Sequence, residues 1–280
     1  MGGIFGMFDF TKPGKGVEKD EPKKKGVARF WELAKRKLWS YVKLNFFYLI
    51  TCIPAFVVVW LILTQILQQM ANAQGDALAA ITFLAFVLSL FLVMCYGLSP
   101  FSAGYYYVLR NYVRENHSWV FADFYGKTKQ NLKKSLIMYF IDLAFMILTL
   151  FSLRIYIILS ISGMFAMQIM LIVYLIMLIL YSVMTSYKWT MTVTFDLNLF
   201  QILKNSLLLV CGEFKRTLIY LVATFFYLVL FYLLFRYFFV VALILFLLIG
   251  FSLFGLIQEM NVLPVIHKYL IPDEEEEPQP

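Results

Sequence analysis

Three polar side chains with proton or cation chemistry interrupt otherwise apolar segments of the sequence. Asp142 lies eight residues after Lys134 inside one apolar run, and Gln258 and Glu259 interrupt another run near its end. A carboxylate at the centre of a bilayer costs about 2.5 kcal/mol or more, so such a group should face a helix bundle or a wet cavity. We therefore predict Asp142, Gln258 and Glu259 as candidate intramembrane polar residues.

Each of these groups has two interpretations. Asp142 either takes part in ion or proton movement or pairs with a Lys, Tyr or Asn side chain of a neighbouring helix. Gln258 and Glu259, together with Asn261, either form a polar cluster with that carboxylate or mark a helix end that emerges into water. The second interpretation is simpler, because Pro264 follows closely.

The usual signatures of catalysis and of metal or phosphate binding are missing from the sequence. It has no GxSxG, P-loop, HExxH or CxxC pattern, and His117 and His267 have no Cys or carboxylate at ligand spacing. We therefore expect a protein that is not an enzyme and that holds no metal ion and no cofactor. Although the net charge is +7, the basic residues flank apolar segments, which favours anionic lipid headgroups and argues against nucleic acid.

Prolines and glycines interrupt two of the apolar runs. A proline removes one helical hydrogen bond and clashes with the preceding turn, so we predict helix breaks at Pro54, Gly97, Pro100 and Gly104. Broken helices often line the solute sites of transporters. A kink without solute contact is the favoured interpretation here, because the second break lies near the end of its segment and has no clear counterpart elsewhere.

The composition predicts a membrane protein. Hydrophobic residues make up 62% of the 280 residues and charged residues 15%, which is more apolar surface than a water-soluble core of this size can bury. A hydrocarbon core of ~30 Å is crossed by about 20 helical residues. We predict an all-α polytopic helical bundle with six transmembrane helices, at 44–68, 78–109, 135–153, 155–187, 217–235 and 237–267.

The distribution of basic residues predicts the orientation. Of the 24 Lys and Arg residues, all but Arg154 and Arg236 fall on one side of this six-span arrangement, and those two lie in the tight turns on the other side. Because basic residues concentrate on the cytoplasmic side, both termini are predicted to be cytoplasmic in a bacterial inner membrane.

Charge and apolar content divide the chain into three parts. Residues 1–28 are predicted to be a disordered cytoplasmic tail, 29–268 the transmembrane helical domain, and 269–280 an acidic cytoplasmic tail. Within 29–43, apolar and basic residues alternate as in an amphipathic helix at the membrane interface, with Trp31 and Trp39 at headgroup level.

The segment 111–134 combines aromatic and basic residues, as docking surfaces do. It either binds a protein partner or anionic lipid or merely lies on the membrane. The candidate partner-docking residues are Trp119, Asp123, Phe124, Tyr125, Lys129, Asn131 and Lys133.

Four stretches resemble the YesL family of small bacterial membrane proteins. They are LNFFYL at 44–49 with the continuation to Pro54, the PxxxGYYYV pattern at 100–108, the Asp-Phe pair and basic helix at 123–135, and the FDL and LKNS elements at 195–206. The resemblance covers about 30–268. The family has no assigned biochemical activity, so the resemblance implies no catalytic residues.

Members of that family commonly accompany extracytoplasmic sugar-binding proteins and ABC importer permeases, which implies a role in carbohydrate uptake. The Glu-Ala-Ala loop by which such a permease docks its ATPase is missing from both predicted cytoplasmic loops. We therefore expect a non-catalytic accessory or regulatory subunit of an ABC-type carbohydrate importer, with permease and ATPase subunits as partners. The alternative is a small secondary transporter with a polar path through Asp142 and Glu259.

Overall fold

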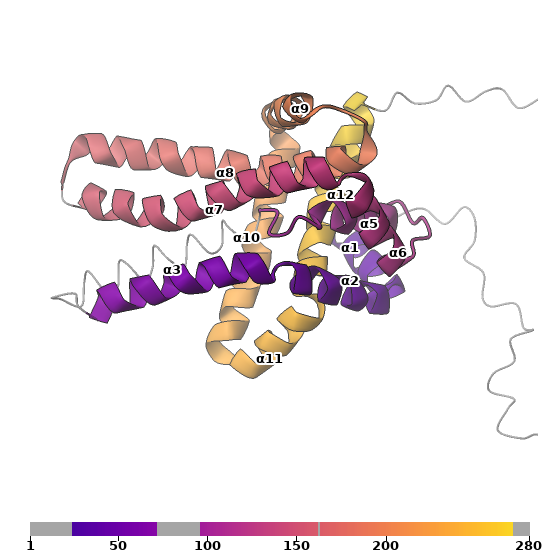
Figure 1. The fold of residues 1–280 in the computed structure, drawn as a ribbon, viewed down its shortest axis with the longest axis horizontal. Helices are drawn as coiled ribbons and strands as arrows, with labels where there is room; N and C mark the ends of the chain where they lie inside the picture. Colours follow the sequence, from indigo (N-terminus) through magenta and orange to yellow (C-terminus); the bar gives the residue numbers. More distant parts are fainter. Residues whose placement is uncertain (1–23, 72–95, 162, 271–280) are drawn as a thin grey trace, which may run out of the picture.

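The computed structural model describes residues 24–71, 96–161 and 163–270, and every regular element in these ranges is a helix (Figure 1). The helices are α1 (Gly26–Arg36), α2 (Leu38–Thr51), α3 (Ile53–Ala71), α5 (Ser102–Val113), α6 (Val120–Gln130), α7 (Leu132–Ile161), α8 (Phe165–Thr194), α9 (Leu199–Gly212), α10 (Phe214–Tyr237), α11 (Phe239–Leu245), the π-helix η2 (Phe246–Gly250) and α12 (Phe251–Leu270). The predicted tails 1–28 and 269–280 lie largely outside the described residues, although α1 already begins at Gly26.

Four helical units are long and apolar enough to cross a membrane. They are α7, α8, α10 and the continuous unit from α11 through α12, and the bent pair α2–α3 makes a fifth if it forms one span. The prediction of six spans is therefore supported only as four to five in the described residues. The predicted span 78–109 lies partly outside them, and its described end contains the first two turns of α5, which continues to Val113.

The α7–α8 hairpin corrects two predicted boundaries. Arg154 does not form the turn, because α7 continues past it to Ile161. The turn comes instead at Gly163, whose φ of +88° lies in the left-handed region that favours glycine. At the other end α8 does not stop at residue 187 but runs on to Thr194, and this extension carries Lys188 into the helix.

The first predicted span is bent. Helices α2 and α3 meet at 59°, with Pro54 as the second residue of α3. A proline in the first turn of a helix removes no intrahelical bond, so the bend falls just before it, at Cys52. The predicted single helix 29–43 is also divided, because α1 ends at Arg36 and α2 begins at Leu38. Its position at the membrane interface stays a prediction.

The π-helix η2 is held by side chains from other helices. Asn45 of α2 donates from Nδ2 to two carbonyl groups of η2, at 2.7 and 3.2 Å, and its Oδ1 accepts from the Ser252 N–H at 3.0 Å. The Tyr227 hydroxyl of α10 donates to the Gly250 carbonyl at 2.5 Å. A π-turn leaves backbone groups without their usual partners, and these side chains supply them.

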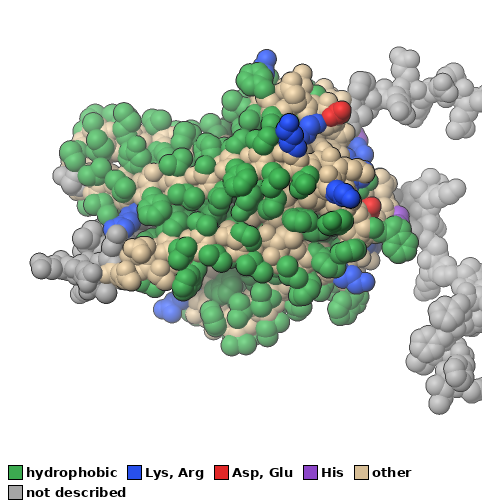
Figure 2. Space-filling view, in the orientation of Figure 1, with side chains coloured by type: hydrophobic (Ala, Val, Ile, Leu, Met, Phe, Trp, Pro, Cys, Tyr) green, Lys and Arg blue, Asp and Glu red, His purple; other side chains and the backbone are tan. Residues whose placement is uncertain are grey.

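The long helices run in two directions. In Figure 1 the antiparallel α7–α8 hairpin extends to the left, whereas α10 and α12 run from top to bottom across its base. Helix α12 packs against α2, α5, α8 and α10, so the centre of the molecule lies where these helices meet. Hydrophobic side chains spread over most of the face in Figure 2, and most of the visible charged side chains lie toward the end that carries α1, α5 and α6.

Candidate functional site

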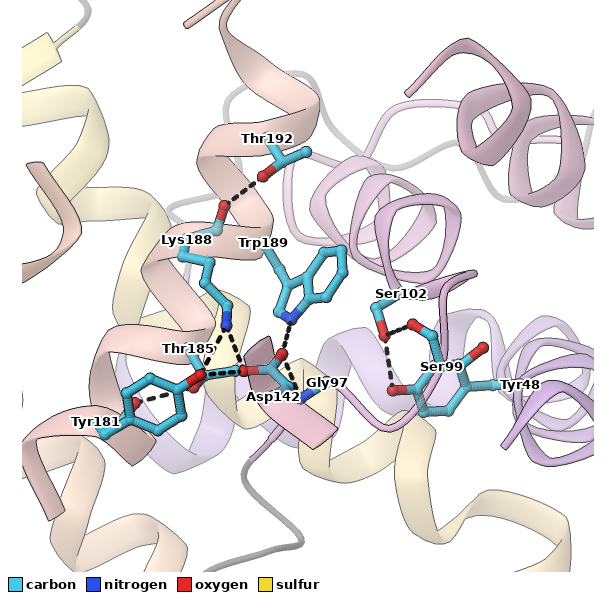
Figure 3. A network of polar contacts seen from close by, with 10 residues as sticks. All are labelled: Tyr48, Gly97, Ser99, Ser102, Asp142, Tyr181, Thr185, Lys188, Trp189 and Thr192. Atoms are coloured by element: carbon cyan, nitrogen blue, oxygen red, sulfur yellow. Dashed lines mark hydrogen bonds and ion pairs between the residues drawn. The ribbon is translucent and has the colours of Figure 1, made fainter. Parts of the chain in front are cut away.

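Asp142 lies at the centre of a buried polar cluster between α7, α8 and the segment 96–101 (Figure 3). Its Oδ1 accepts hydrogen bonds from the Lys188 ammonium and from the Tyr181 hydroxyl, the latter at 2.6 Å. Its Oδ2 accepts from the Trp189 indole N–H at 3.0 Å and from the Gly97 N–H at 3.1 Å. We call these five residues the Asp142 centre. Both charged side chains are 1% exposed or less.

The non-helical segment before α5 supplies one of the four donors. Residues 96–101 are not helical, so the Gly97 N–H is free to reach the carboxylate. A Cβ on Gly97 would collide with the Trp189 ring and the Asp142 carboxylate, so only glycine fits this position. Pro100 lies in the same segment, just before α5. At the predicted break between Gly97 and Pro100, the described residues 96–101 are non-helical and α5 begins only at Ser102.

Gly104 was predicted to break a helix, but in the structure it allows two helices to pack closely. It lies inside α5, where its N–H donates to the Thr128 hydroxyl at 3.2 Å. A Cβ there would collide with the Phe124 carbonyl of α6. Gly104 therefore allows α5 and α6 to approach closely.

The C-terminal half of α8 positions the cation. Tyr181 and Lys188 are seven residues apart and so lie on one face of the helix. The Thr185 hydroxyl donates to the Tyr181 carbonyl at 2.9 Å, and the Thr192 hydroxyl donates to the Lys188 carbonyl at 2.7 Å. Because these hydroxyls bond within their own helix, α8 carries many polar residues through the packed interior without unpaired groups.

Lys188 is the residue that sequence reasoning missed. It directly follows the predicted span 155–187, which places it in a cytoplasmic connection, whereas in the structure its side chain is fully buried. Its spacing could have indicated this position: Lys188 lies seven residues after Tyr181, and no helix-breaking residue separates them, so both belong on one face of one helix. Of the two interpretations of Asp142, the structure has the pairing with Lys and Tyr side chains of a neighbouring helix.

A second polar cluster surrounds Glu259 on α12. The carboxyl is fully buried, and its Oε1 accepts from the Thr190 hydroxyl of α8 at 2.5 Å. The neighbouring Gln258 accepts from the Tyr106 hydroxyl of α5 at 2.8 Å and donates to the Tyr220 hydroxyl of α10 at 3.2 Å. We call these five residues the Glu259 centre. Four helices thus contribute to it.

The simpler interpretation of these residues, a helix end that emerges into water, is wrong. Gln258 is 2% exposed and Asn261 is 9% exposed. Helix α12 continues through Pro264 to Leu270, so the polar residues lie well inside it and pack against α5, α8 and α10.

Consecutive residues in one turn of α8 contribute to both centres, which are therefore adjacent. Lys188 and Trp189 bind Asp142, and Thr190 follows directly and binds Glu259. In addition, the Tyr106 ring stacks on the Trp189 ring with 6.4 Å between centroids. Asp142 and Glu259 therefore belong to two adjacent clusters, each with its own set of partners.

The candidate docking residues fall into two groups. Three of them support the fold. Asp123 accepts from the Trp119 N–H at 2.8 Å at the start of α6, Phe124 is buried and stacks on Phe101, and Asn131 donates to the Lys127 carbonyl at 3.0 Å.

The other four candidates are exposed: Trp119, Tyr125, Lys129 and Lys133. Trp119 is 72% exposed and Tyr125 is 53% exposed. These side chains remain free to contact a partner.

The histidines and acidic residues of the described ranges lie in separate contacts. No group of three or more His, Cys, Asp and Glu residues there is placed to hold a metal ion. His267 instead lies 2.7 Å from a guanidinium nitrogen of Arg114, and His117 packs edge-on against Trp119. Chemically, the Asp142 centre provides a fixed and fully compensated charge pair, and the Glu259 centre provides a carboxyl group with a single hydrogen bond.

Comparison with known protein families gives a match over part of the chain. A family model described as a protein of unknown function, DUF624, matches residues 78–153. No curated protein and no solved structure matches the chain. The matched range includes Gly97, Pro100 and Asp142 but ends before Lys188, so it contains only one side of the charge pair. Over residues 78–153 the chain is therefore similar to DUF624, an uncharacterised domain whose family is the YesL-like one.

Proposed function

We propose that this protein is a non-catalytic integral membrane protein that acts as an accessory or regulatory subunit of an ABC-type carbohydrate importer. In this proposal it lies in the bacterial cytoplasmic membrane with both termini in the cytoplasm. The observation that carries the proposal is the saturation of the Asp142 carboxylate by four donors.

A saturated carboxylate is poorly suited to bind a passing solute. To reach Asp142, a cation or polar solute would have to displace Lys188 or break bonds to Tyr181 and Trp189. Breaking a buried ion pair costs about 3–5 kcal/mol, because it leaves an uncompensated charge. The pair therefore supports a role in which the helix bundle stays assembled and works through its outer surface.

The exposed side chains along α6 and at its two flanks form the surface that fits a partner best. Trp119 and Tyr125 present large aromatic rings, and Phe121 beside them is 63% exposed. Aromatic residues are enriched at protein interfaces, where they supply most of the binding energy. Lys129 and Lys133 add positive charge, which suits an acidic partner surface or anionic headgroups. The choice of an ABC importer as the partner rests on the resemblance to the YesL family.

The test is affinity purification of the full-length tagged protein from its native membrane in mild detergent. We expect permease and ATPase subunits of one importer in stoichiometric amounts. The double variant Trp119→Ala/Tyr125→Ala should lose them, because it removes the exposed aromatic contacts. Phe165→Ala, which truncates a 74% exposed ring at the far end of α8, is the matched control and should keep them. Recovery of the wild-type protein alone, under conditions that keep a known importer intact, would contradict the proposal.

A second function, secondary transport, is favoured by the contact between the broken segment and the charge pair. The Gly97 N–H donates to Asp142, so a backbone break and a buried carboxylate lie together as in transporter sites. Solute flux into proteoliposomes distinguishes the two functions. Flux that is abolished by Asp142→Asn and kept in Asp196→Asn, whose carboxylate is exposed, would favour transport.

A further inference from the structure

The Glu259 carboxyl has one oxygen with no partner. Its Oε1 accepts from Thr190, whereas Oε2 is buried and has no hydrogen-bond partner among the described residues. The side chain as a whole is 0% exposed. An ionised carboxylate that is buried without a contacting cation or a second donor is strongly unfavourable, and such a group takes up a proton instead.

The charged groups that face Glu259 are directed elsewhere. Arg110 of α5 donates to the Val193 carbonyl at 3.0 Å and to the Thr194 hydroxyl at 2.9 Å, both at the end of α8. Arg114 of α5 is engaged with His267. None of the ion pairs in the described ranges includes Glu259.

The remaining titratable neighbours supply no positive charge to the carboxyl. Tyr105 and Tyr106 of α5 donate their hydroxyl protons to the Phe251 carbonyl and to Gln258, and the Tyr220 hydroxyl of α10 accepts from Gln258. The one cation on α8, Lys188, is bound to Asp142.

We propose that Glu259 is a proton-binding site, with a proton held on Oε2 at neutral pH while α8 and α12 are packed together. The proton comes from water and returns to it, and no other bond changes. In this state the neutral carboxyl accepts the Thr190 hydrogen bond through its carbonyl oxygen, and Oε2 carries the acidic hydrogen. The proposal does not depend on the proposed function, because it concerns one carboxyl group in the interior of the isolated protein.

The test is infrared spectroscopy of the full-length protein in detergent at neutral pH. A protonated carboxyl has a C=O stretching band that ionised carboxylates lack, and exposed Asp and Glu side chains are ionised at this pH. We expect one such band in the wild-type protein. Glu259→Gln should abolish it. Asp196→Asn, the control at an exposed carboxylate, should leave it unchanged.

A second variant keeps the test decisive if Glu259→Gln does not fold. Thr190→Val preserves the size of the side chain and removes the donor to the carbonyl oxygen, so the band should move to higher wavenumber without losing intensity. The proposal is overturned if the wild-type protein shows no band at neutral pH, if folded Glu259→Gln keeps the band, or if Thr190→Val leaves its position unchanged.

Discussion

The Asp142 and Glu259 centres are equally buried but are compensated in opposite ways. Asp142 has a cation and three further donors, one of them a backbone N–H from outside any helix. Glu259 has a single hydroxyl donor. Burial alone therefore does not determine what a carboxyl group does in this protein. The number and charge of its partners decide whether it is a fixed negative charge or a group that can gain and lose a proton.

The two centres also hold different parts of the structure together. The Asp142 centre ties the non-helical segment 96–101 to α7 and α8, so it holds a break in place. The Glu259 centre joins regular helices that already pack through apolar side chains. We expect damage to the first centre to disrupt the fold more than damage to the second.

The largest effect should come from Lys188→Met. This change keeps the length of the side chain but leaves Asp142 buried without a cation, and it should lower the free energy of unfolding by about 3–5 kcal/mol. Reversible unfolding in mixed micelles measures it. Adding Asp142→Asn to Lys188→Met removes the unpaired charge and should restore a large part of the loss. A Lys188→Met protein as stable as the wild type would show that the pair contributes nothing.

A smaller loss is expected from Gly97→Ala. The added methyl group meets the Trp189 ring and the Asp142 carboxylate, and relieving that overlap should cost about 1–3 kcal/mol. Gly126→Ala is the matched control, because nothing lies within 4 Å of the added atom, and replacing a helical glycine should stabilise α6 by roughly 0.5–1 kcal/mol. Equal stability of the two variants in the same unfolding assay would contradict the role of Gly97.

Glu259→Gln should cost less than about 1 kcal/mol at neutral pH, because the amide resembles a protonated carboxyl and keeps the acceptor for Thr190. The corresponding change Asp142→Asn leaves Lys188 buried without a carboxylate and should cost several times more. The ratio of the two losses, measured by unfolding under identical conditions, tests the comparison directly. Equal losses would mean that the two centres are compensated alike.

The smallest effect is expected at an ion pair in water. The hydrogen bond and charge of Lys134, 2.7 Å away, lower the pKa of Asp196, which is exposed. A depressed pKa in the folded state adds stability above the unfolded value of about 3.9, and this is lost as the pH falls through the folded value. Asp196→Asn should therefore lower the thermal midpoint slightly at neutral pH and not at all in strong acid.

Salt provides the control for that prediction. The Lys134–Asp196 pair is exposed, so about 1 M salt should remove the difference between Asp196→Asn and the wild type. The loss in Lys188→Met should persist in the same salt, since its pair is buried. A salt-sensitive Lys188→Met would indicate that water reaches the Asp142 centre.

Much of the helical framework follows from the sequence, because long apolar runs predict helices directly. The non-helical segment around Gly97 and Pro100 and the bend near Pro54 also agree with the sequence, since glycine destabilises a helix interior and proline disfavours a helical conformation in the residue before it. The turn of the α7–α8 hairpin was misplaced because a single charge, Arg154, was given more weight than Gly163. An isolated arginine does not end a helix, whereas a glycine in the left-handed region does.

For the two carboxyl groups, the sequence could predict the residue types of the partners but not which residues they are. A costly carboxylate requires a Lys, Tyr or Asn partner, but hydropathy predicts that this helix ends before Lys188, which places the true partner outside the membrane span. Ser and Thr residues lower the mean hydropathy of a segment, but a helix can continue through them because their hydroxyls donate to carbonyls of the same helix. Thr185 and Thr192 do this in α8. The pairing of Thr190 with Glu259 depends on how α8 and α12 cross, which local sequence does not encode.

The π-helix η2 determines which side chains of α12 face each neighbouring helix, because α12 follows it directly. A π-turn accommodates one more residue than an α-turn, and each residue of a helix advances by about 100° around the axis. Without that extra residue, the side chain at position 259 would face a different neighbour. Asn45 of α2 stabilises η2 through its hydrogen bonds. It therefore helps to set the direction in which the Glu259 side chain leaves α12, although it does not contact Glu259.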